Sequence, residues 1–330
     1  MNIYSLLKLN RLLKNPFAVG FGIWLFHVLN KRYLAIFFDP ILACNLRCKM
    51  CYFSNEEKRK TFKGFFADND LSRIAEVIFP HALKLQIGCG AEPTLFKHNV
   101  QIVKLAKQYK IPYISLTTNA NLLSSDLIED LLDAGLNEFT ISLHGVNKES
   151  YEYLMQGASY EKFLSALNEI SRIKDQYTNS KLRVNFTVCE ENMDELEDFF
   201  KVFDAVKIDI LQVRPMQDIG GEKKNIVNQS SFNKKFNTVS LLLKDECSKR
   251  NITYIAPLQL EEKMKENRSS SIMDSTYCYI SPRCFFHSDL DWHNETFRQY
   301  AKRTKYAKRL FKQIFSKKQY SSKHLGYEIN

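Results

Sequence analysis

Three cysteines, Cys44, Cys48 and Cys51, fall within eight residues of one another. Thiolates at this spacing in one loop can wrap one face of a compact inorganic core, and thiolates are the ligands that iron–sulfur clusters use. Only three ligands are local, so a cubane [4Fe–4S] cluster would keep one iron open for an exchangeable ligand. The alternative is a zinc ion completed by a distant His or Cys, although zinc sites more often show paired C-x-x-C units. The spacing therefore favours an iron–sulfur cluster.

The cysteine loop follows the first of several short β-branched or aromatic runs that alternate with helical stretches. We predict six strands, at 35–43, 83–88, 113–118, 138–143, 182–188 and 207–213, from their composition and flanking turns. Helices are predicted at 68–79, 97–109, 124–134, 160–174, 193–203 and 231–249. Because parallel strands need a helical crossover, this alternation predicts an α/β fold with a parallel sheet.

The alternation does not give the order of the strands. A doubly wound sheet and an open barrel both fit the pattern. In either fold, function collects at the carboxyl ends of the strands, so the residues just after each strand are the candidates for a site. The cysteine loop occupies one of these positions.

The chain resembles the radical SAM family, which carries a C-x-x-x-C-x-x-C loop after the first strand of a partial (β/α)6 barrel. Here that loop holds Cys44, Cys48 and Cys51, the predicted metal ligands. After the second strand, residues 88–93 (GCGAEP) are similar to the family's Gly-Gly-Glu-Pro turn. The resemblance implies that Glu92 receives the amino group of S-adenosylmethionine (SAM) and that Gly90 allows close backbone approach. Ala91 replaces the second glycine of the family pattern.

Further turns match the family in order along the chain. Asn119 lies in a turn similar to the family's Thr-Asn-Gly, and Ser142 ends the fourth strand where the family places a small hydroxyl residue near the ribose. Val188 closes the strand that would line the adenine, and Met50 holds the bulky position before the third cysteine. The resemblance therefore assigns Met50, Gly90, Glu92, Asn119, Ser142 and Val188 to cofactor binding.

The resemblance also implies the chemistry and the fold. A [4Fe–4S] cluster would bind SAM at its open iron and cleave it reductively to a 5′-deoxyadenosyl radical, which abstracts hydrogen from a substrate. An external electron donor such as flavodoxin or ferredoxin would supply the electron. The implied fold is a partial (β/α)6 barrel with an N-terminal apolar helix and a C-terminal extension.

Catalytic residues are open, with Cys89, Cys189 and His144 as candidates because each lies at a predicted strand end. A thiol there could donate a hydrogen atom or act as a ligand, and the alternative is a small buried apolar residue. His144 could contact substrate or serve as an acid or base. Arg214, after the sixth strand, could clamp an anion at the barrel mouth.

The net charge of +10 belongs to the two ends of the chain. Residues 1–33 hold five bases and no acid, residues 291–330 hold ten bases and three acids, and the middle is close to neutral. Such ends suit an anionic partner, either a membrane surface or a nucleic acid. The apolar stretch at 16–29 has no cleavage site after it and is too short to span a bilayer, so we predict an uncleaved helix that packs on the domain or lies at a membrane interface.

These observations divide the chain into an N-terminal helical segment at 1–33, a barrel at 34–256 and an extension at 257–330. The extension holds Cys278 and Cys284 but lacks the full cysteine pattern of the SPASM and twitch extensions that carry auxiliary clusters in the family. A weak second metal site or a structural role for this pair stays open.

Ordinary apolar and charged fractions exclude a disordered chain, a collagen-like repeat and a polytopic membrane protein. We expect a cytoplasmic radical SAM enzyme whose ends suit membrane association, acting on a peptide or on a membrane-proximal glycan or lipid precursor. The alternatives are a zinc-stabilised nucleic-acid-binding module and a radical SAM enzyme that modifies RNA.

Overall fold

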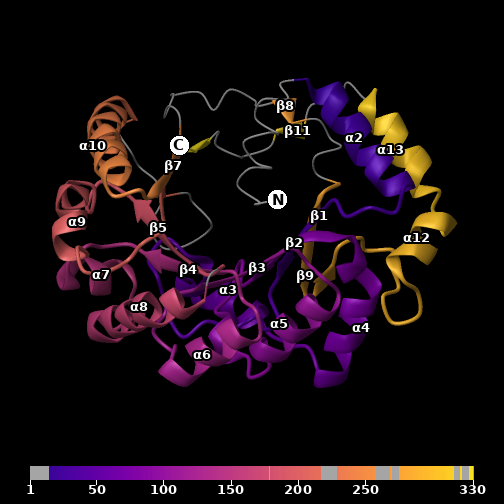
Figure 1. The fold of residues 1–330 in the computed structure, drawn as a ribbon, viewed down its shortest axis with the longest axis horizontal. Coiled ribbons are helices and arrows are strands. Elements are labelled where there is room, and N and C mark those ends of the chain that lie inside the picture. The colour runs from indigo at the N-terminus through magenta and orange to yellow at the C-terminus, as the bar shows by residue number, and fades with distance from the viewer. Residues whose placement is uncertain are drawn as a thin grey trace.

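A curved sheet of ten strands organises the chain in the computed structural model, which describes residues 15–177, 179–216, 229–257, 268–269, 275–315, 320–321 and 327–329. The strand order is β10-β9-β1-β2-β3-β4-β5-β6-β7-β12 (Figure 1). The strands are β1 Leu34–Phe38, β2 Ala82–Ile87, β3 Tyr113–Thr118, β4 Glu138–Leu143, β5 Lys181–Val188, β6 Ile210–Pro215, β7 Thr253–Pro257, β9 Tyr277–Ser281, β10 Cys284–Phe285 and β12 Tyr327–Ile329. A separate two-stranded sheet pairs β8 (Arg268–Ser269) with β11 (Tyr320–Ser321).

Helices cover the convex side of this sheet (Figure 1). Between the strands lie α3 Glu56–Thr61, α4 Asp68–Ile78, α5 Asn99–Gln108, α6 Ser125–Asp133, α7 Lys148–Leu154, α8 Tyr160–Ile173, α9 Phe199–Val202 and α10 Gln229–Lys249. Towards the chain ends lie α2 Pro16–Val28, α12 Phe297–Arg303 and α13 Tyr306–Ile314.

Strands β1 to β7 follow one another in chain order and are all parallel. A doubly wound sheet would reverse its strand order at a switch point, so the sequential order excludes that alternative. The predicted α/β fold with an open, partial barrel is confirmed. The C-terminal segment also joins this sheet, because β9 pairs in parallel with β1.

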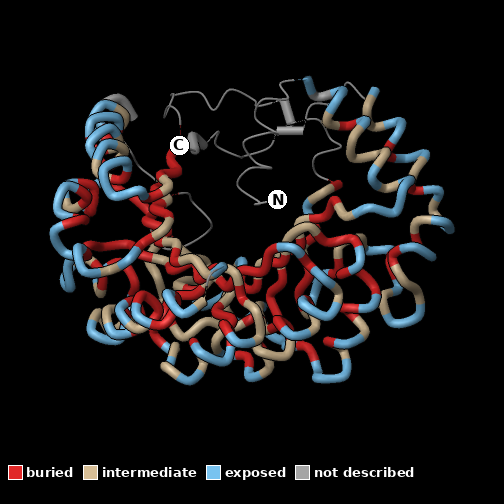
Figure 2. Tube along the Cα trace, in the orientation of Figure 1, coloured by how far each residue is buried: buried red, intermediate tan, exposed pale blue. Residues whose placement is uncertain are grey.

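Alternation along the strands separates an apolar outer face from a polar inner face. On β4, Phe139 and Ile141 are fully buried beneath the helices. Equivalent outward positions on the neighbouring strands are also apolar and buried, and they include Leu85, Ile87, Ile114, Leu116, Val184, Phe186, Leu211 and Val213. Figure 2 shows buried residues concentrated along the strands and exposed residues on the outer helices. This layer is the main hydrophobic core.

The inner face of the sheet carries a buried ion pair. Arg183 Nε lies 3.1 Å from Glu138 Oε1, and the Tyr113 hydroxyl donates to the same carboxylate. Burial raises the pKa of Glu138 and the pKa of Tyr113. Removing one partner of a buried pair leaves an uncompensated charge. This network therefore ties together the amino-terminal ends of β3, β4 and β5 while keeping the interior of the barrel polar.

Two predicted elements differ most from the structure. The strand predicted at 35–43 ends at Phe38, because Asp39 is followed by Pro40, which has no N–H to donate to a ladder. The helix predicted at 193–203 begins instead as a 3-10 turn, Asp194–Asp198, before α9. Four acids crowd this turn, and like charges three or four residues apart destabilise an α-helix.

The predicted apolar helix is α2, which packs against α13. Arg32 fixes the chain after α2, because its guanidinium donates to the carbonyl oxygens of Phe79, Ala82 and Tyr109. Within the described ranges, no helix combines the length and the apolar character needed to cross a bilayer.

The stability of this fold should fall in mild acid because of His81. Its ring is 8% exposed and lies edge-on to Phe297, with 5.0 Å between centroids. Burial lowers the pKa of His81 to about 4, with nearby His27 and Arg32 adding to the effect. Its folded pKa is below its unfolded value, so the neutral ring is tolerated above about pH 6.5, and stability is lost as the pH falls from there towards 4.

We therefore expect His81→Phe to lose less stability than the wild type when urea unfolding at pH 7.5 is compared with unfolding at pH 5. The expected difference is about 2 kcal/mol. His293→Phe, at an exposed position, is the control and should follow the wild type. Equal losses for His81→Phe and the wild type would contradict this account.

Candidate functional site

The loop that carries the three cysteines is held in place by backbone bonds from two other segments. Arg47 N donates to Gln156 O at 2.8 Å, and Lys49 N donates to Leu154 O at 3.0 Å. The turn after β2 also contributes, since Glu92 N donates to the carbonyl oxygen of Ala43 at 2.9 Å. The loop is therefore fixed on both flanks before any ligand binds.

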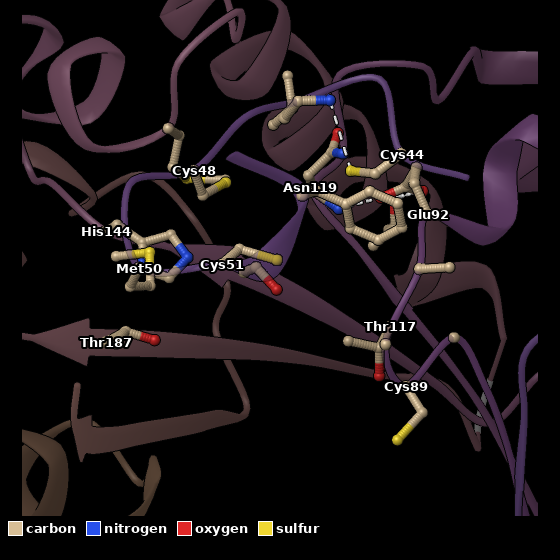
Figure 3. Close-up of a pocket in the computed structure, with 18 of the residues that line it drawn as sticks. Cys44, Cys48, Met50, Cys51, Cys89, Glu92, Thr117, Asn119, His144 and Thr187 are labelled. Carbon is tan, nitrogen blue, oxygen red and sulfur yellow. Dashed lines mark hydrogen bonds between the residues drawn. The ribbon is translucent and has the colours of Figure 1, made fainter. Parts of the chain in front are cut away.

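Cys44, Cys48 and Cys51 all line one cavity, and Figure 3 shows their sulfur atoms around a shared space. In the part of the chain that the structure describes, no group of three or more His, Cys, Asp or Glu side chains could hold one metal ion. A four-iron cluster is larger, and each thiolate would bind a different iron, so this arrangement fits a [4Fe–4S] cluster. Burial raises the pKa of Cys44 to about 12, so cluster assembly must displace thiol protons.

Glu92 lies beside this space with its carboxylate buried and already oriented. Its Oε1 accepts hydrogen bonds from Thr118 Oγ1 at 2.6 Å and from both the N and the Oγ1 of Thr94. Its Oε2 accepts from Asn119 N at 2.8 Å. Oε1 therefore has three donors and Oε2 has one, so Oε2 keeps the capacity to accept a ligand's amino group. Burial raises the pKa of Glu92 against these donors.

Asp39 joins the ends of three strands and was not singled out from the sequence. Its Oδ1 accepts from Cys89 N at 2.7 Å, and its Oδ2 accepts from Gly90 N at 3.0 Å and from the Tyr279 hydroxyl at 2.8 Å. The sequence places Asp39 inside the strand predicted at 35–43, so nothing there marks it as a site residue. Asp39 shapes the turn on which Glu92 sits.

Gly88 begins this turn with φ at +80°, a conformation that side chains rarely adopt. A Cβ at this position would lie 2.4 Å from Thr117 O and 2.8 Å from Pro93 Cγ. Because the clash is with backbone, Gly88→Ala should cost about 2 kcal/mol or more in unfolding free energy and weaken SAM binding.

Gly22 supplies the matched control for that substitution. It lies inside α2, and a Cβ there would meet nothing within 4 Å. Gly22→Ala should leave SAM binding unchanged and raise stability by up to about 1 kcal/mol. Urea unfolding and equilibrium dialysis with SAM check both variants. A Gly88→Ala protein as stable as the wild type would show that the turn can relax.

The cavity has a volume of about 360 Å³ and extends from the cysteines along the carboxyl ends of β2 to β6. Thr117, His144, Thr187 and Arg214 line it beyond the cysteine loop. His144 is 8% exposed, and its Nδ1 has no hydrogen-bond partner among the described residues. Burial, aided by the charge of Arg214, lowers the pKa of His144 to about 3, so its ring is neutral. This part of the cavity suits a polar ligand.

Most of the predicted cofactor residues reach the cavity. Met50, Gly90, Glu92, Asn119 and Ser142 line it. Val188 does not, because its side chain points into the core beneath the helices, and its neighbour Thr187 faces the cavity instead. Side chains alternate along a strand, so a difference of one residue moves the side chain to the opposite face.

The candidate catalytic residues divide in the same way. Cys89 and His144 line the cavity, and Cys89 Sγ lies 3.9 Å from the Tyr277 hydroxyl. Cys189 is 1% exposed, does not line the cavity, and packs in a small cluster with Met50, Leu154 and Met216. The alternative of a buried apolar residue therefore describes Cys189.

Cys278 and Cys284 do not form a disulfide bond in the structure. Cys278 is fully buried in β9, whereas Cys284 is exposed on β10. In the antiparallel β9–β10 hairpin, Cys284 lies opposite Ser281. Their burial places the two thiols in different environments.

Comparisons with known proteins agree with this geometry. A family model described as "Radical SAM superfamily" matches residues 39–203, half of the chain. A probable GTP 3′,8-cyclase of Sulfurisphaera tokodaii is 23% identical over 207 residues, which are 63% of this chain and 62% of that protein. The GTP 3′,8-cyclase of Peptoclostridium acidaminophilum is 31% identical over 169 residues, which are 51% of this chain and 50% of that protein. The chain thus spans about half to three fifths of the length of these curated relatives.

Solved structures show the same fold at low identity. Streptococcus suis SuiB bound to S-adenosylmethionine aligns with a TM-score of 0.61 and 17% identity, covering 82% of this chain and 65% of SuiB. Native anSMEcpe with bound AdoMet aligns with a TM-score of 0.61 and 16% identity, covering 86% of this chain and 84% of that one. Together with the family model and the cysteine loop after β1, these similarities show that the chain belongs to the radical SAM superfamily.

Proposed function

We propose that this radical SAM enzyme uses Cys44, Cys48 and Cys51 to hold its [4Fe–4S] cluster and Glu92 to bind the amino group of SAM. The cofactors supply reductive cleavage of SAM to a 5′-deoxyadenosyl radical that abstracts hydrogen from a substrate. The observation that carries the proposal is the convergence of three thiols and the buried Glu92 carboxylate on one cavity. Nothing in the fold or the comparisons supports a zinc-stabilised nucleic-acid-binding module or an enzyme acting on RNA.

The protein contributes binding, orientation and the exclusion of water. Oε2 of Glu92 is the oxygen with capacity left, so it would accept the amino group while Oε1 stays bonded to Thr118 and Thr94. Asn119 Nδ2 donates to Asn45 Oδ1 at 2.9 Å, which ties the turn after β3 to the cysteine loop. Both cofactor-binding turns are thereby held at a constant separation.

The substrate would enter the part of the cavity lined by Thr117, His144, Thr187 and Arg214. Arg214 Nε lies 3.5 Å from Thr187 Oγ1, and Arg214 forms no ion pair with any other described residue. A polar substrate suits this lining better than an apolar one, because buried donors and acceptors such as His144 Nδ1 need partners. Peptides and membrane-proximal glycan or lipid precursors both meet that condition.

GTP is a second candidate substrate because the relatives named above are GTP 3′,8-cyclases. The cationic Arg214 at the cavity would suit its phosphates. Incubation of the reduced enzyme with SAM and GTP, followed by mass spectrometry for a cyclised product, tests this candidate directly.

Anaerobic reconstitution tests the proposal as a whole. We expect about four iron atoms per chain and release of 5′-deoxyadenosine when dithionite and SAM are added. Flavodoxin or ferredoxin with its reductase should replace dithionite as the electron donor. A protein that binds a full complement of iron and SAM yet releases no 5′-deoxyadenosine would overturn the proposal.

Arg214→Gln tests whether this side of the cavity is reserved for substrate. We expect iron content and the SAM Kd to stay within about twofold of the wild type, since the proposal assigns Arg214 no contact with SAM. Lys162→Gln, at an exposed position on α8, is the control. A tenfold rise in the SAM Kd for Arg214→Gln alone would place Arg214 on the cofactor.

A further inference from the structure

Two helices from opposite ends of the chain form one surface. α2 and α13 lie side by side at the edge of the molecule beyond β9 and β1 (Figure 1). Their aromatic rings meet along the junction, with centroids 5.3 Å apart for Phe17 and Phe315 and for Trp24 and Phe311. Phe21 extends the group by packing on Trp24 at the same spacing. We call Phe17, Phe21, Trp24, Phe311 and Phe315 the aromatic surface.

Much of the aromatic surface faces solvent. Phe17, Phe21, Phe311 and Phe315 are 48%, 42%, 41% and 59% exposed. Single exposed apolar residues are ordinary, but a contiguous group of large rings marks a surface that binds something. α2 also contains no charged residue, so its outer face has no polar group that would favour contact with water over contact with an apolar phase.

The two chain segments that carry the aromatic surface are basic and contain no acid. Residues 15–33 and 297–315 together hold nine Lys and Arg and no Asp or Glu. Lys308 and Lys312 share the exposed face of α13 with Phe311 and Phe315, since helical residues three and four apart are neighbours. Neither lysine has an ion-pair partner among the described residues. Arg303, by contrast, is paired with Glu295.

This combination matches the chemistry of an anionic lipid surface. Interfacial helices bury aromatic side chains at the boundary between headgroups and acyl chains, while adjacent Lys and Arg contact anionic headgroups. At 13 residues α2 is about 20 Å long, which suits a helix lying in the interface and not one crossing it. A protein partner would have to supply an apolar groove surrounded by acidic side chains. An anionic bilayer already presents an apolar interior directly beneath its anionic headgroups.

We propose that the aromatic surface docks this enzyme peripherally on membranes that contain anionic lipids. The inference stands apart from the proposed function, because none of these residues lines the catalytic cavity. The aromatic side chains provide apolar insertion and the lysines provide electrostatic attraction. Binding therefore needs both the apolar insertion and the electrostatic attraction, and it weakens as salt screens the electrostatic attraction.

Co-sedimentation with vesicles tests the proposal on the full-length, anaerobically purified protein. We expect binding to vesicles of phosphatidylcholine mixed with phosphatidylglycerol, and much weaker binding to phosphatidylcholine alone. Lys308→Glu combined with Lys312→Glu should lower the partition coefficient on anionic vesicles about tenfold or more. Phe21→Ser combined with Phe315→Ser should lower it by a similar factor.

Matched controls come from other faces of the molecule. Leu241→Ser with Leu242→Ser changes two exposed apolar residues on α10, at the opposite end of the sheet (Figure 1). Lys97→Glu with Lys104→Glu repeats the change in net charge near α5, away from the aromatic surface. Both controls should bind vesicles within about twofold of the wild type if the surface is specific.

Three results would overturn the proposal. The first is equal binding of all variants to the vesicles, and the second is no binding by the wild type. The third is a dimer in the wild type that the aromatic variant converts to a monomer without any change in vesicle binding, because the surface would then serve a second copy of the chain. Release of 5′-deoxyadenosine in the absence of lipid should be the same for every variant, which confirms that each one folds.

Discussion

Replacing Cys44, Cys48 and Cys51 together with alanine will remove the brown colour of the anaerobic protein and reduce 5′-deoxyadenosine release to background. Changes in residues that merely support metal ligands lower affinity or activity about 10- to 100-fold, so loss of the ligands themselves should exceed about a hundredfold. Each single variant should also fail, because the three thiols line one space and Cys89, the one further cysteine in that lining, lies on the turn after β2 and not in the cysteine loop. Iron analysis and chromatography of the SAM cleavage products measure the effect.

Cys89 provides a control for the substitution of the three cluster cysteines. It lines the same cavity but lies on the turn after β2, near the Tyr277 hydroxyl. Cys89→Ala should therefore keep its iron and still release 5′-deoxyadenosine, as should Cys284→Ala on the exposed β10. Unaltered iron content and SAM cleavage in the triple variant would refute the proposed function.

Glu92→Gln should raise the Kd for SAM about 10- to 100-fold, which is the loss expected for one charge-assisted hydrogen bond. The substitution removes the negative charge from a carboxylate that is 3% exposed and surrounded by donors. An amide also brings its own N–H groups towards Asn119 N or Thr118 Oγ1, which already donate to this side chain. Equilibrium dialysis with SAM, with unfolding followed in parallel, separates lost binding from lost stability.

Thr94→Val is the matched control for Glu92→Gln. It removes one donor to Oε1 and leaves both the charge and Oε2 in place. We expect its SAM Kd to rise no more than about threefold, in line with the small net value of one neutral hydrogen bond. If Glu92→Gln stays folded and binds SAM as tightly as Thr94→Val, the amino group is held elsewhere. Because burial raises the pKa of Glu92, lowering the pH should protonate its carboxylate and weaken SAM binding by the wild type, as Glu92→Gln does.

The strands and the cysteine loop were predictable because local signals agreed. Short β-branched or aromatic runs marked β2 to β6, and the turns after them carried recognisable residues. Val188 was assigned to the cofactor although Thr187 lines the cavity, because the motif locates a strand end but not which face a given side chain takes. The stretch at 194–198 has the apolar spacing of a helix, but repulsion among its four acids opposes an α-helix there, and it forms a 3-10 turn.

The sequence alone does not identify contacts between residues that lie far apart in the chain. Asp39 lies inside the strand predicted at 35–43, and its role depends on Cys89, Gly90 and Tyr279, the last of which is 240 residues away. The joining of α2 with α13 likewise requires knowing that both ends of the chain return to the same edge of the sheet. Charge counts indicated that each end is basic, but only the structure brings the two ends together.

The pairing of β9 with β1 has a consequence for the order in which the enzyme is made. A nascent chain carries its cluster cysteines long before residues 277–281 leave the ribosome, and until then β1 is an edge strand with unpaired backbone groups. Tyr279 is also not yet present to bond Asp39. The turn that carries Glu92 therefore gains its full set of supporting bonds only after residues 277–281 have been synthesised, and we expect iron–sulfur delivery to be most effective after that point.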